Sequence, residues 1–443
     1  MGLSENFLEK AEKGTLTVGI VGLGYVGLPL AEAYVRQNVA VIGYDISQAR
    51  AEQLASGLSG MKHIDDTRVQ SMLDKGLFTA TADASALKDA DAILIAVPTP
   101  LDVHHQPDLS YVTSTCETLK LHLRPGQLIV LESTTYPGTT EEVMKPILEQ
   151  SGLIANKDFA LAYSPEREDP GNPDFETATI PKVVGADNEE ARAMAKAVYD
   201  KIVETVMVSN TRTAEAAKLV ENIYRWINIA TVNEMKMIFE KMDIDIWEVV
   251  NAAKTKPFGF QAFYPGPGVG GHCIRIDPYY LSWKAREHGL STQFIELAGE
   301  INTRMPRRIV TRLLEELSLR LQKALSGANI LLCGLAYKKD IDDMRESPSL
   351  ELLHILREHE ANVSFYDPLI PVVPPTREHP ELADMKSIVW STETLSSFDA
   401  AIIATDHSAV DYTELCSNVP LIIDTRNATA DIFDQFSDRI VKA

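Results

Sequence analysis

The sequence predicts an α/β protein with two Rossmann-like domains, each a doubly wound parallel sheet, joined by a long central helix. Three observations predict this fold. A Gly-x-Gly-x-x-Gly motif follows an apolar run near the N-terminus, the same order of strands and turns returns after about residue 325, and the stretch 211–243 contains neither proline nor glycine. We therefore expect three domains, at residues 1–210, 211–320 and 321–443.

The composition restricts the possible partners and the compartment. The chain has 443 residues, 45% of them hydrophobic and 24% charged, which is typical of a globular protein. Its formal net charge of −21 argues against nucleic acid or an anionic membrane as a partner, because both attract basic surfaces. The cysteines are widely spaced, which favours a reducing compartment, and no apolar run reaches the length of a membrane-spanning helix. We expect a protein of the cytoplasm.

The clearest local signal lies at the start of the first domain. An apolar run at 16–21 predicts a buried strand, and a helical pattern follows the glycine motif. Such glycines allow a tight turn and let a pyrophosphate approach the N–H groups at the start of a helix. The motif therefore predicts a dinucleotide site. The residues of this turn are Gly22, Gly24, Tyr25, Val26 and Gly27.

A carboxylate follows the next predicted strand. The apolar run 40–44 ends at Asp45, at the distance from the glycines where a carboxylate accepts hydrogen bonds from the adenosine ribose. Because Asp45 would repel the 2′-phosphate of NADP, it favours NAD. Arg50 is close enough in the sequence to offer a phosphate a cation, which weakens this preference.

Further apolar strands of the first domain lead into loops with reactive side chains. Ligands of parallel α/β sheets bind at the carboxyl ends of the strands. The segment "DAILIAVPTP" leads to Thr99 and "QLIVLESTTYPG" leads to Thr134, two hydroxyls that we place beside the cofactor or substrate. The segment "FALAYSPERED" brings Glu166 and Arg167 into another such loop.

Residues 211–243 read as one long helix. Apolar residues recur along it at helical spacing, as at Ala217, Val220 and Ala230. We expect this helix to connect two lobes and to pack against a partner subunit, which predicts a homodimer or a higher homo-oligomer. Lys218 and Asn222 are four residues apart and share a face, where such a pair is usually solvated surface.

The opening order of strands then returns in "ANILLCGLAYKKD", "ANVSFYDP", "DAAIIATDH" and "PLIIDTRN". In this copy larger side chains replace the later glycines, and arginines lie nearby. The residues concerned are Ala336, Tyr337, Lys338, Lys339, Arg345 and Arg426. Cationic side chains can hold a diphosphate in place of bare backbone, so we expect a local basic site in this otherwise acidic chain.

The segment "FYPGPGVGGHCIRIDPYYL", residues 263–281, surrounds Cys273 with small residues. Asp277 and Pro278 read as the N-cap and first position of a helix, which places Cys273 about one turn before its start. The partial positive charge of a helix N-terminus lowers a thiol pKa, as would Arg275 or Lys218. The glycines would let a polar substrate approach. We predict a nucleophilic thiol.

Taken in order, these motifs resemble the UDP-glucose/GDP-mannose dehydrogenase family of nucleotide-sugar 6-dehydrogenases. The resemblance covers nearly the whole chain, through "GLGYVGLP", "VPTP", "ESTTYPGTT", "YSPER", "EAAKLVEN", "GPGVGGHCIRIDPYYL", "GLAYKKDIDDMRESPS" and "IDTRN". It implies oxidation of a primary alcohol of a UDP-sugar to a carboxylate, in two hydride transfers to NAD. It also implies that a cysteine holds the intermediate as a thiohemiacetal and then as a thioester, and that the product serves surface polysaccharide.

The resemblance assigns roles to individual residues. Cys273 matches the nucleophile, and Lys218 with Asn222 match the pair that stabilises developing oxyanions. Asp277 and Glu166 match carboxylates that handle protons and water. The residues expected at the catalytic centre are Cys273, Lys218, Asn222, Asp277, Glu166 and Thr134. Those expected at the cofactor are Gly22, Gly24, Tyr25, Val26, Gly27, Asp45, Arg50, Thr99, Thr134 and, near the nicotinamide, Arg345. Those expected at the UDP-sugar are Glu166, Arg167, Lys218, Asn222, Tyr264, Gly268, Tyr337, Lys338 and Arg426. No metal is expected.

Within this family the chain is more similar to enzymes for UDP-N-acetylhexosamines than to those for UDP-glucose. Val269 stands in "GVGGHC" where UDP-glucose enzymes present a phenylalanine, which would leave room for a 2-acetamido group, and His272 could donate to its carbonyl. We expect UDP-N-acetylglucosamine, with the UDP forms of N-acetylmannosamine and N-acetylgalactosamine as alternatives. Two other classes stay open: a non-catalytic NAD- or nucleotide-sugar-binding regulator, and a two-electron dehydrogenase with an inert cysteine.

Overall fold

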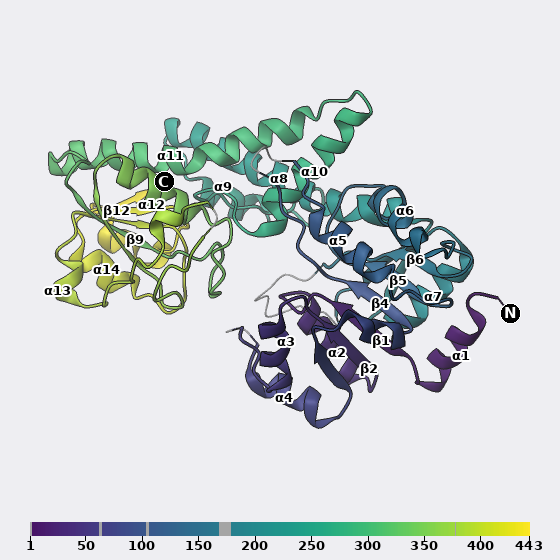
Figure 1. Ribbon diagram of the computed structural model, residues 1–443. Coiled ribbons are helices and arrows are strands. Elements are labelled where there is room, and N and C mark those ends of the chain that lie inside the picture. Colours follow the sequence, from purple (N-terminus) through teal and green to yellow (C-terminus); the bar gives the residue numbers. More distant parts are fainter. Residues whose placement is uncertain (1, 62–63, 103–105, 168–178, 377) are drawn as a thin grey trace. The chain divides into compact units, whose positions relative to one another are not determined.

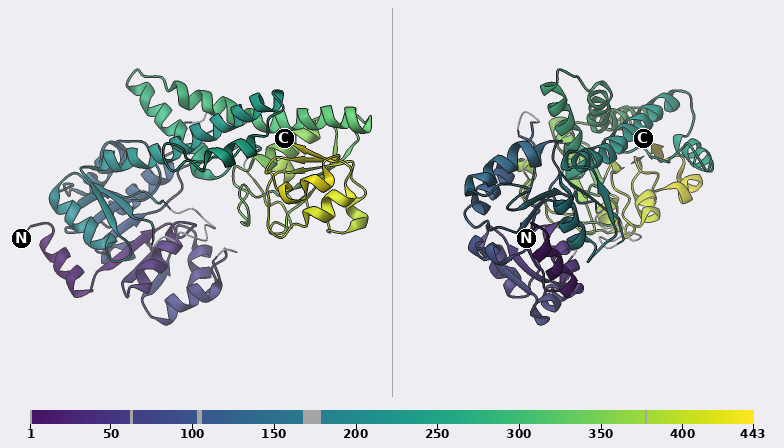
Figure 2. Two further views of the ribbon diagram at one scale, coloured as in Figure 1. Left: turned by 180° about the vertical axis from the view of Figure 1, so that it is seen from behind. Right: turned by 90° about the vertical axis from the view of Figure 1, so that its right-hand side faces the viewer.

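Figure 1 shows the computed structural model of the chain, which describes residues 2–61, 64–102, 106–167, 179–376 and 378–443; the side chains of His272 and Cys273 lie outside this description. The chain forms two compact units. The first consists of Met1–Asn222 and Tyr279–Ser291, and the second of Ile223–Pro278 and Thr292–Ala443. Each unit contains its own sheet, drawn in purple to teal in the first and in yellow-green in the second (Figure 2).

The first unit is built on an eight-stranded sheet with the order β3-β2-β1-β4-β5-β6-β7-β8. Neighbouring strands run parallel except β6 and β7, which are antiparallel. The strand order changes direction between β1 and β4, which is the usual ligand-binding point of such a sheet. The strands are β1 (Thr17–Val21), β2 (Ala40–Tyr44), β3 (Phe78–Thr81), β4 (Ala92–Ile95), β5 (Leu128–Leu131), β6 (Ala160–Tyr163), β7 (Lys182–Ala186) and β8 (Thr205–Val208).

Helices cover both faces of this sheet because its central strands are apolar on both sides. Alternate residues such as Ile20 and Leu94 share a buried core with Leu30, whereas Ile93 and Ile129 pack on the opposite face. The helices of this unit are α1 (Glu5–Lys13), α2 (Gly27–Arg36), α3 (Gln48–Ala55), α4 (Asp66–Asp74), α5 (Ser110–Leu119), α6 (Lys145–Leu148) and α7 (Glu189–Tyr199), with the short helices η1 (Ala84–Asp89), η2 (Thr139–Met144) and η3 (Glu149–Ser151).

The second unit contains a five-stranded, entirely parallel sheet with the order β10-β9-β11-β12-β13. Its strands also bury both faces: Ile330 and Leu353 share one core, and Leu331 and Leu415 share the other. The strands are β9 (Asn329–Cys333), β10 (Asn362–Tyr366), β11 (Ala400–Ile403), β12 (Ile422–Asp424) and β13 (Ile440–Lys442). The helices are α9 (Ile246–Ala253), α11 (Gln293–Leu321), α12 (Pro348–Glu358), α13 (Thr392–Leu395), α14 (Tyr412–Asn418), α15 (Phe433–Phe436), η4 (Pro380–Leu382) and η5 (Ala430–Ile432).

The first turn of each sheet has the same backbone geometry. Gly22 follows β1 with φ of 89°, and its N–H donates to the Tyr44 carbonyl at 2.8 Å. Gly334 follows β9, also with φ of 89°, and its N–H donates to the Tyr366 carbonyl at 2.8 Å. Glycine is required at both positions because side chains rarely adopt this φ. The prediction of two Rossmann-like doubly wound domains with a long central helix is confirmed.

The long helix predicted at 211–243 is α8 (Thr211–Lys241). Two side chains mark its start: the Thr211 N–H donates to Asp187 Oδ1 at 3.2 Å, and the Thr213 N–H donates to Asn210 Oδ1 at 2.8 Å. These bonds satisfy amides that lack a partner inside the helix. In the second unit, Trp226 Nε1 donates to the Ile295 carbonyl of α11 at 3.1 Å.

The helix after the cysteine begins earlier than predicted. Helix α10 spans His272–Glu287, so Cys273 is its second residue, and Asp277 and Pro278 lie inside it. The prediction that Asp277 is an N-cap is therefore wrong. Pro278 removes one intrahelical hydrogen bond, a cost of about 3 kcal/mol in a helix interior, and burial of the apolar side chains of Ile276 and Tyr280 offsets part of this cost. Cys273 consequently lies in the first turn, where the backbone N–H groups have no intrahelical partner.

Candidate active site

The glycine turn after β1 leaves open space at one position. A Cβ at Gly22 would lie 2.6 Å from the Ala96 carbonyl oxygen, and a Cβ at Gly27 would lie 1.8 Å from the Gly22 carbonyl oxygen. The fold itself therefore requires both glycines. Gly24 is exposed, and nothing lies within 4 Å of the position its Cβ would take. This open position before α2 fits a pyrophosphate, which can approach bare backbone there.

Asp45 closes the same turn from the end of β2. Its carboxylate accepts from the Leu23 N–H at 3.0 Å and from the Ser47 N–H at 2.9 Å. The Arg50 guanidinium donates to the Leu23 carbonyl at 2.8 Å and 3.1 Å, and also to Ser59. Arg50 therefore braces the loop and is already engaged, which removes the argument that it would attract a 2′-phosphate. These residues fit NAD.

The loops after β4 and β5 carry the two predicted threonines. Thr99 is buried, and its carbonyl accepts from the Tyr280 hydroxyl of α10 at 3.1 Å. Ser133 Oγ donates to the Val97 carbonyl at 2.6 Å, and Thr134 is half-buried beside it in the sequence. Both threonines thus lie in loops at the carboxyl edge of the sheet, and the hydrogen bond from Ser133 to Val97 joins these two loops.

A buried lysine with two carboxylates lies where β5 and β6 end and β7 begins, and the sequence did not indicate it. Lys182 Nζ lies 2.6 Å from Glu132 Oε2 and 3.0 Å from Glu166 Oε2, and the side chains of Lys182 and Glu132 are 4% and 0% exposed. The Tyr199 hydroxyl donates to the other Glu132 oxygen, and the Arg167 N–H donates to Glu166 Oε1 at 2.7 Å. Lys182 therefore fixes the orientation of Glu166.

The ionisation of this cluster follows from its burial and its charges. Burial lowers the pKa of Lys182, but the charges of Glu132 and Glu166 outweigh it, so the net pKa is raised and the lysine stays protonated. Burial raises the pKa of Glu132, and the positive charge of Lys182 opposes this effect. We infer an ionised Glu132 because its ammonium partner is in direct contact.

Lys218 and Asn222 are buried, not solvated. They are 7% and 6% exposed on α8. Within the described residues, Lys218 has neither an ion-pair nor a hydrogen-bond partner, which is unusual for a buried ammonium and leaves its donors available. On the adjoining turn, Glu221 pairs with Arg167 at 2.7 Å, which ties the Glu166–Arg167 loop to the helix.

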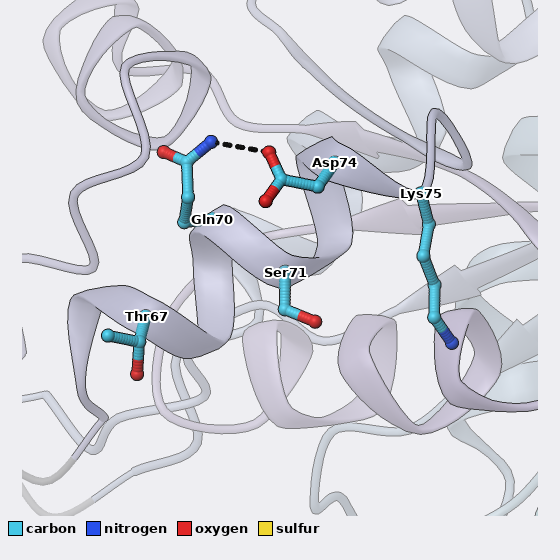
Figure 3. Close-up of a pocket in the computed structure, with 5 residues that line it drawn as sticks. All are labelled: Thr67, Gln70, Ser71, Asp74 and Lys75. Carbon is cyan, nitrogen blue, oxygen red and sulfur yellow. Dashed lines mark hydrogen bonds between the residues drawn. The ribbon is translucent and has the colours of Figure 1, made fainter.

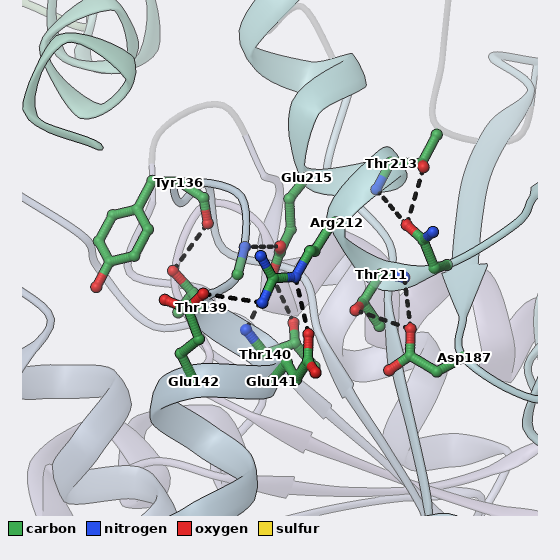
Figure 4. Close-up of polar contacts among 12 residues, drawn as sticks. Tyr136, Thr139, Thr140, Glu141, Glu142, Asp187, Thr211, Arg212, Thr213 and Glu215 are labelled. Atoms are coloured by element: carbon green, nitrogen blue, oxygen red, sulfur yellow. Dashed lines mark hydrogen bonds and ion pairs between the residues drawn. The ribbon is translucent and has the colours of Figure 1, made fainter. Parts of the chain in front are cut away.

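Figure 4 shows how α8 also holds the loop after β5. Glu215 accepts from the N–H groups of Gly138 at 2.5 Å and Thr140 at 2.9 Å, and from the Thr140 hydroxyl at 2.7 Å. Arg212, one turn earlier, pairs with Glu141 and Glu142 at 2.8 Å and 2.9 Å. The buried Glu215 therefore replaces the missing partners at the start of η2, and the loop that carries Thr134 is fixed to α8.

In the second unit, the glycines before Cys273 pack against the protein itself. A Cβ at Gly270 would lie 2.5 Å from the Tyr337 Cβ, and a Cβ at Gly266 would lie 2.6 Å from a guanidinium nitrogen of Arg426. Gly268 has φ of 134° and faces Pro348. The interpretation that these glycines leave room for substrate is wrong for Gly266 and Gly270. They allow the thiol segment to touch residues expected at the UDP site.

Five of the residues expected at the UDP-sugar, Tyr264, Gly268, Tyr337, Lys338 and Arg426, lie in loops of the second unit. Arg426 follows β12, and its Nε donates to the Ala404 carbonyl at 2.9 Å. Tyr264 stacks on Trp247 with ring centroids 5.3 Å apart. Tyr337 and Lys338 follow β9 and are half-buried. The strand order changes direction between β9 and β11, as it does between β1 and β4 in the first unit, so the loop after β9 borders this point and the loop after β12 lies on the far side of β11.

The arginines near the thiol segment are engaged with carboxylates. Arg275 forms ion pairs with Glu346 at 3.1 Å and Glu378 at 3.4 Å, and Arg345 pairs with Asp343 at 2.6 Å. Arg275 thus links α10 to two loops. The sequence had suggested only that its positive charge could lower the pKa of the thiol. The Arg345 carbonyl accepts from the Gly271 N–H at 3.2 Å. Cys273 and His272 lie outside the described side chains.

The pocket drawn in Figure 3 belongs to none of these groups. It lies on α4 and is lined by Thr67, Gln70, Ser71, Asp74 and Lys75, of which Gln70 donates to Asp74 at 2.8 Å. It contains no residue that the sequence assigned to the cofactor, the substrate or the reaction. Separately, no helix among the described residues has the length and apolar character needed to cross a membrane.

Comparison with known proteins gives matches over most of the chain. Models of the UDP-glucose/GDP-mannose dehydrogenase family match it in three parts: the NAD binding domain at residues 16–203, the central domain at 212–304 and the UDP binding domain at 331–431.

Individual relatives are similar over comparable lengths. Protein CapL of Staphylococcus aureus is 39% identical, covering 79% of this chain and 81% of its own. UDP-N-acetyl-D-glucosamine 6-dehydrogenase of Pseudomonas aeruginosa is 35% identical, covering 89% of this chain and 91% of its own. The solved UDP-D-ManNAc dehydrogenase of Pyrococcus horikoshii superposes with a TM-score of 0.83 at 33% identity, covering 93% of this chain and 96% of its own.

Proposed function

This chain belongs to the UDP-glucose/GDP-mannose dehydrogenase family, and from that membership we propose that it oxidises the C6 alcohol of a UDP-N-acetylhexosamine to the carboxylate with NAD. The observation that best supports a catalytic role is Lys218, a buried ammonium whose donors have no partner within the described residues. Burying an ammonium without a protein partner costs stability, and its free donors suit an oxyanion that develops during a reaction.

Each step of the proposed reaction uses a residue of this chain. The glycine turn and Asp45 of the first unit would hold NAD, and two NAD molecules in succession would supply the two hydride acceptors that the four-electron oxidation needs. The Cys273 thiolate adds to the aldehyde carbon, and the oxyanion that forms accepts hydrogen bonds from Lys218 and Asn222. After the second oxidation, water attacks the carbonyl carbon of the thioester and the carbon–sulfur bond breaks. This step regenerates the Cys273 thiolate and releases the carboxylate product. Glu166 and Asp277 take up the protons of alcohol and water.

Several contacts support these assignments. The backbone of Cys273 lies in the first turn of α10, where the helix dipole favours a thiolate. Lys182 and the Arg167 N–H orient Glu166, so its carboxylate keeps one geometry through the reaction. Lys182 is thus a positioning residue. We propose the remaining cofactor and substrate residues as the family resemblance implies them, with Arg345 and Arg426 in loops of the second unit.

The preferred sugar is proposed to be UDP-N-acetylglucosamine, for supply of a uronic acid to surface polysaccharide. The similarity to the Pseudomonas aeruginosa enzyme supports it, while the Pyrococcus horikoshii structure keeps the N-acetylmannosamine form as the alternative. Val269 is half-buried and packs with Trp226 and Ala298 in an apolar cluster, which holds its side chain in place where UDP-glucose enzymes present a phenylalanine.

A panel of UDP-sugars tests this function. We expect the highest kcat/KM for UDP-N-acetylglucosamine among the UDP forms of glucose and the N-acetylated hexosamines, with two NADH formed per sugar consumed. One NADH per sugar would indicate a two-electron dehydrogenase, and none would indicate a binding protein. Cys273→Ser should retain NAD binding and lose formation of the acid, because a hydroxyl is a far weaker nucleophile than a thiolate.

A homodimer or higher oligomer is proposed as the working form. Helix α8 exposes apolar side chains along its length, and burial of such a stripe against a second copy would remove it from water. The residues are Val220, Tyr224, Met235 and Ile238. Light scattering at micromolar concentration should give at least twice the monomer mass. The division into parts at 1–210, 211–320 and 321–443, and a cytoplasmic location, remain proposals of the same kind.

A further inference from the structure

Two histidines and a glutamate of the second unit meet at a point outside the residues assigned to NAD or to the UDP-sugar. His354 lies on α12, and His379 and Glu381 lie at the start of η4. His354 Nδ1 is 2.9 Å from Glu381 Oε1, and His379 Nδ1 is 3.3 Å from the same oxygen. One ligand atom from each residue lies within 4.8 Å of the other two.

These separations suit a small divalent ion. Zinc binds imidazole nitrogen and carboxylate oxygen at about 2.0–2.2 Å, so neighbouring ligand atoms of a tetrahedral site are about 3.3 Å apart. The 3.3 Å contact from His379 Nδ1 to Glu381 Oε1 matches this separation, and the 2.9 Å contact from His354 Nδ1 is shorter. All three ligand atoms lie within 4.8 Å of one another, so the side chains must draw closer around the ion to complete three corners of a tetrahedron.

The second observation concerns the opposite nitrogen of each ring. His379 Nε2 lies 3.4 Å from Glu351 Oε2, and His354 Nε2 lies 3.4 Å from Glu358 Oε1. Histidines that bind metals characteristically donate their other N–H to a carboxylate, which orients the ring and makes the ligating nitrogen more basic. Here a carboxylate of α12 lies within 3.4 Å of the other nitrogen of each ring, in place to accept such a bond.

We propose that His354, His379 and Glu381 form a binding site for one zinc-class divalent cation, with Glu351 and Glu358 supporting the two rings. Imidazole and carboxylate ligands select transition ions such as Zn²⁺ over Ca²⁺ or Mg²⁺, which prefer oxygen alone. The fourth position is left for water. The three ligands come from two separate segments, so the ion joins α12 to the start of η4.

The proposed metal site is connected through Glu378 to the helix that contains Cys273. Glu378 directly precedes His379 and pairs with Arg275, which lies two residues after Cys273 in α10. Fixing His379 would therefore fix the carboxylate that holds Arg275. The proposal itself needs no assumption about the reaction, since metal binding is measured without substrate.

The test uses the untagged full-length chain carrying Cys273→Ser, which removes a thiol that could itself bind zinc. The other cysteines, Cys116, Cys333 and Cys416, are buried. After equilibrium dialysis against ZnCl₂ and removal of free ion, the bound metal is counted by mass spectrometry. The affinity is measured by competition with a chromophoric chelator, and Co²⁺ replaces Zn²⁺ to give the visible absorption of a tetrahedral site.

We expect one zinc per chain, loss of at least about a hundredfold in affinity for His379→Gln or Glu381→Gln, and a loss of about 10–100-fold for the supporting variant Glu351→Gln. His359→Gln is the matched control, because His359 is exposed at the C-cap of the same helix, and it should retain the wild-type affinity. Circular dichroism checks that every variant is folded.

Two outcomes would overturn the proposal. The first is a chain that retains no zinc after dialysis, which would leave these residues as a hydrogen-bonded surface cluster. The second is an equal zinc affinity of the His379→Gln, Glu351→Gln and control His359→Gln chains, which would place the ion elsewhere. Neither outcome depends on whether the chain oxidises a UDP-sugar.

Discussion

Replacing Lys182 with methionine tests the buried carboxylate cluster of the first unit. In the native chain the ammonium contacts Glu132 at 2.6 Å and Glu166 at 3.0 Å, and Glu132 is fully buried. Removing one partner of a buried ion pair costs about 3–5 kcal/mol, because the other charge is left without compensation. We expect Lys182→Met to lower the free energy of unfolding by that amount, with the Tyr199 hydroxyl as the remaining donor to Glu132.

The loss should depend on pH in a defined direction. Without Lys182, burial raises the pKa of Glu132 above its unfolded value of about 4.3. A raised folded-state pKa contributes stability below the unfolded pKa, and this contribution is lost as pH rises through the folded value. The difference between Lys182→Met and the native chain should therefore shrink as the pH is lowered from 8 to 5.

Urea unfolding followed by circular dichroism measures the free energy, and hydrogen exchange of peptides from β5, β6 and β7 localises the change to this cluster. The control is Glu132→Gln combined with Lys182→Met, which removes both charges and should recover most of the stability. A Lys182→Met chain within about 1 kcal/mol of the native value, or a double variant no more stable than the single one, would refute this reasoning.

Three further predictions concern the two sheets. Gly24→Ala should raise KM for NAD at unchanged thermal stability, because no protein atom lies within 4 Å of the added Cβ; a lowered Tm would contradict an open position. Gly270→Ala should raise KM for the UDP-sugar about tenfold and leave that for NAD unchanged, since its Cβ would meet the Tyr337 Cβ at 2.5 Å. Burial alone would raise the pKa of Asp367, but hydrogen bonds from His407 and from the Leu335 and Leu369 amides lower it. The Asp367 carboxylate therefore stabilises the fold above the unfolded pKa of about 3.9, and this stabilisation is lost as pH falls through the folded pKa. Asp367→Asn should make the free energy of unfolding fall less steeply as the pH is lowered below about 4, and an unchanged fall would argue against a stabilising role of the carboxylate.

The strands that could be predicted from the sequence are those buried on both faces. Continuous apolar runs such as 92–95 and 400–403 stand out because nothing polar interrupts them. Strand β8 was not predicted, because it is only partly buried and its pattern is weak. Helix α11 was not predicted either: Pro306 lies in its interior, where the usual rule ends a helix, and packing of Met305 and Ile309 outweighs that rule.

The sequence also predicts single side chains better than their partners. Glu166 could be selected from a loop at a strand end, but Lys182 and Glu132 are distant in sequence and carry no local pattern. Lys218 could be selected as a helix residue, yet its burial depends on tertiary packing that spacing does not express. In both cases the missing information is long-range contact, which only the folded chain provides.

The contact between the glycine segment and the nucleotide-site loops has a consequence for turnover. Tyr337 and Arg426, proposed to hold the uridine diphosphate, touch the chain at Gly270 and Gly266, a few residues from Cys273. Binding of the nucleotide, which is remote from the reacting carbon, can therefore help to hold the thiol segment in the position that the reaction needs. A hexosamine offered without its nucleotide should lose turnover as well as affinity, and free UDP added alongside it should restore part of the rate.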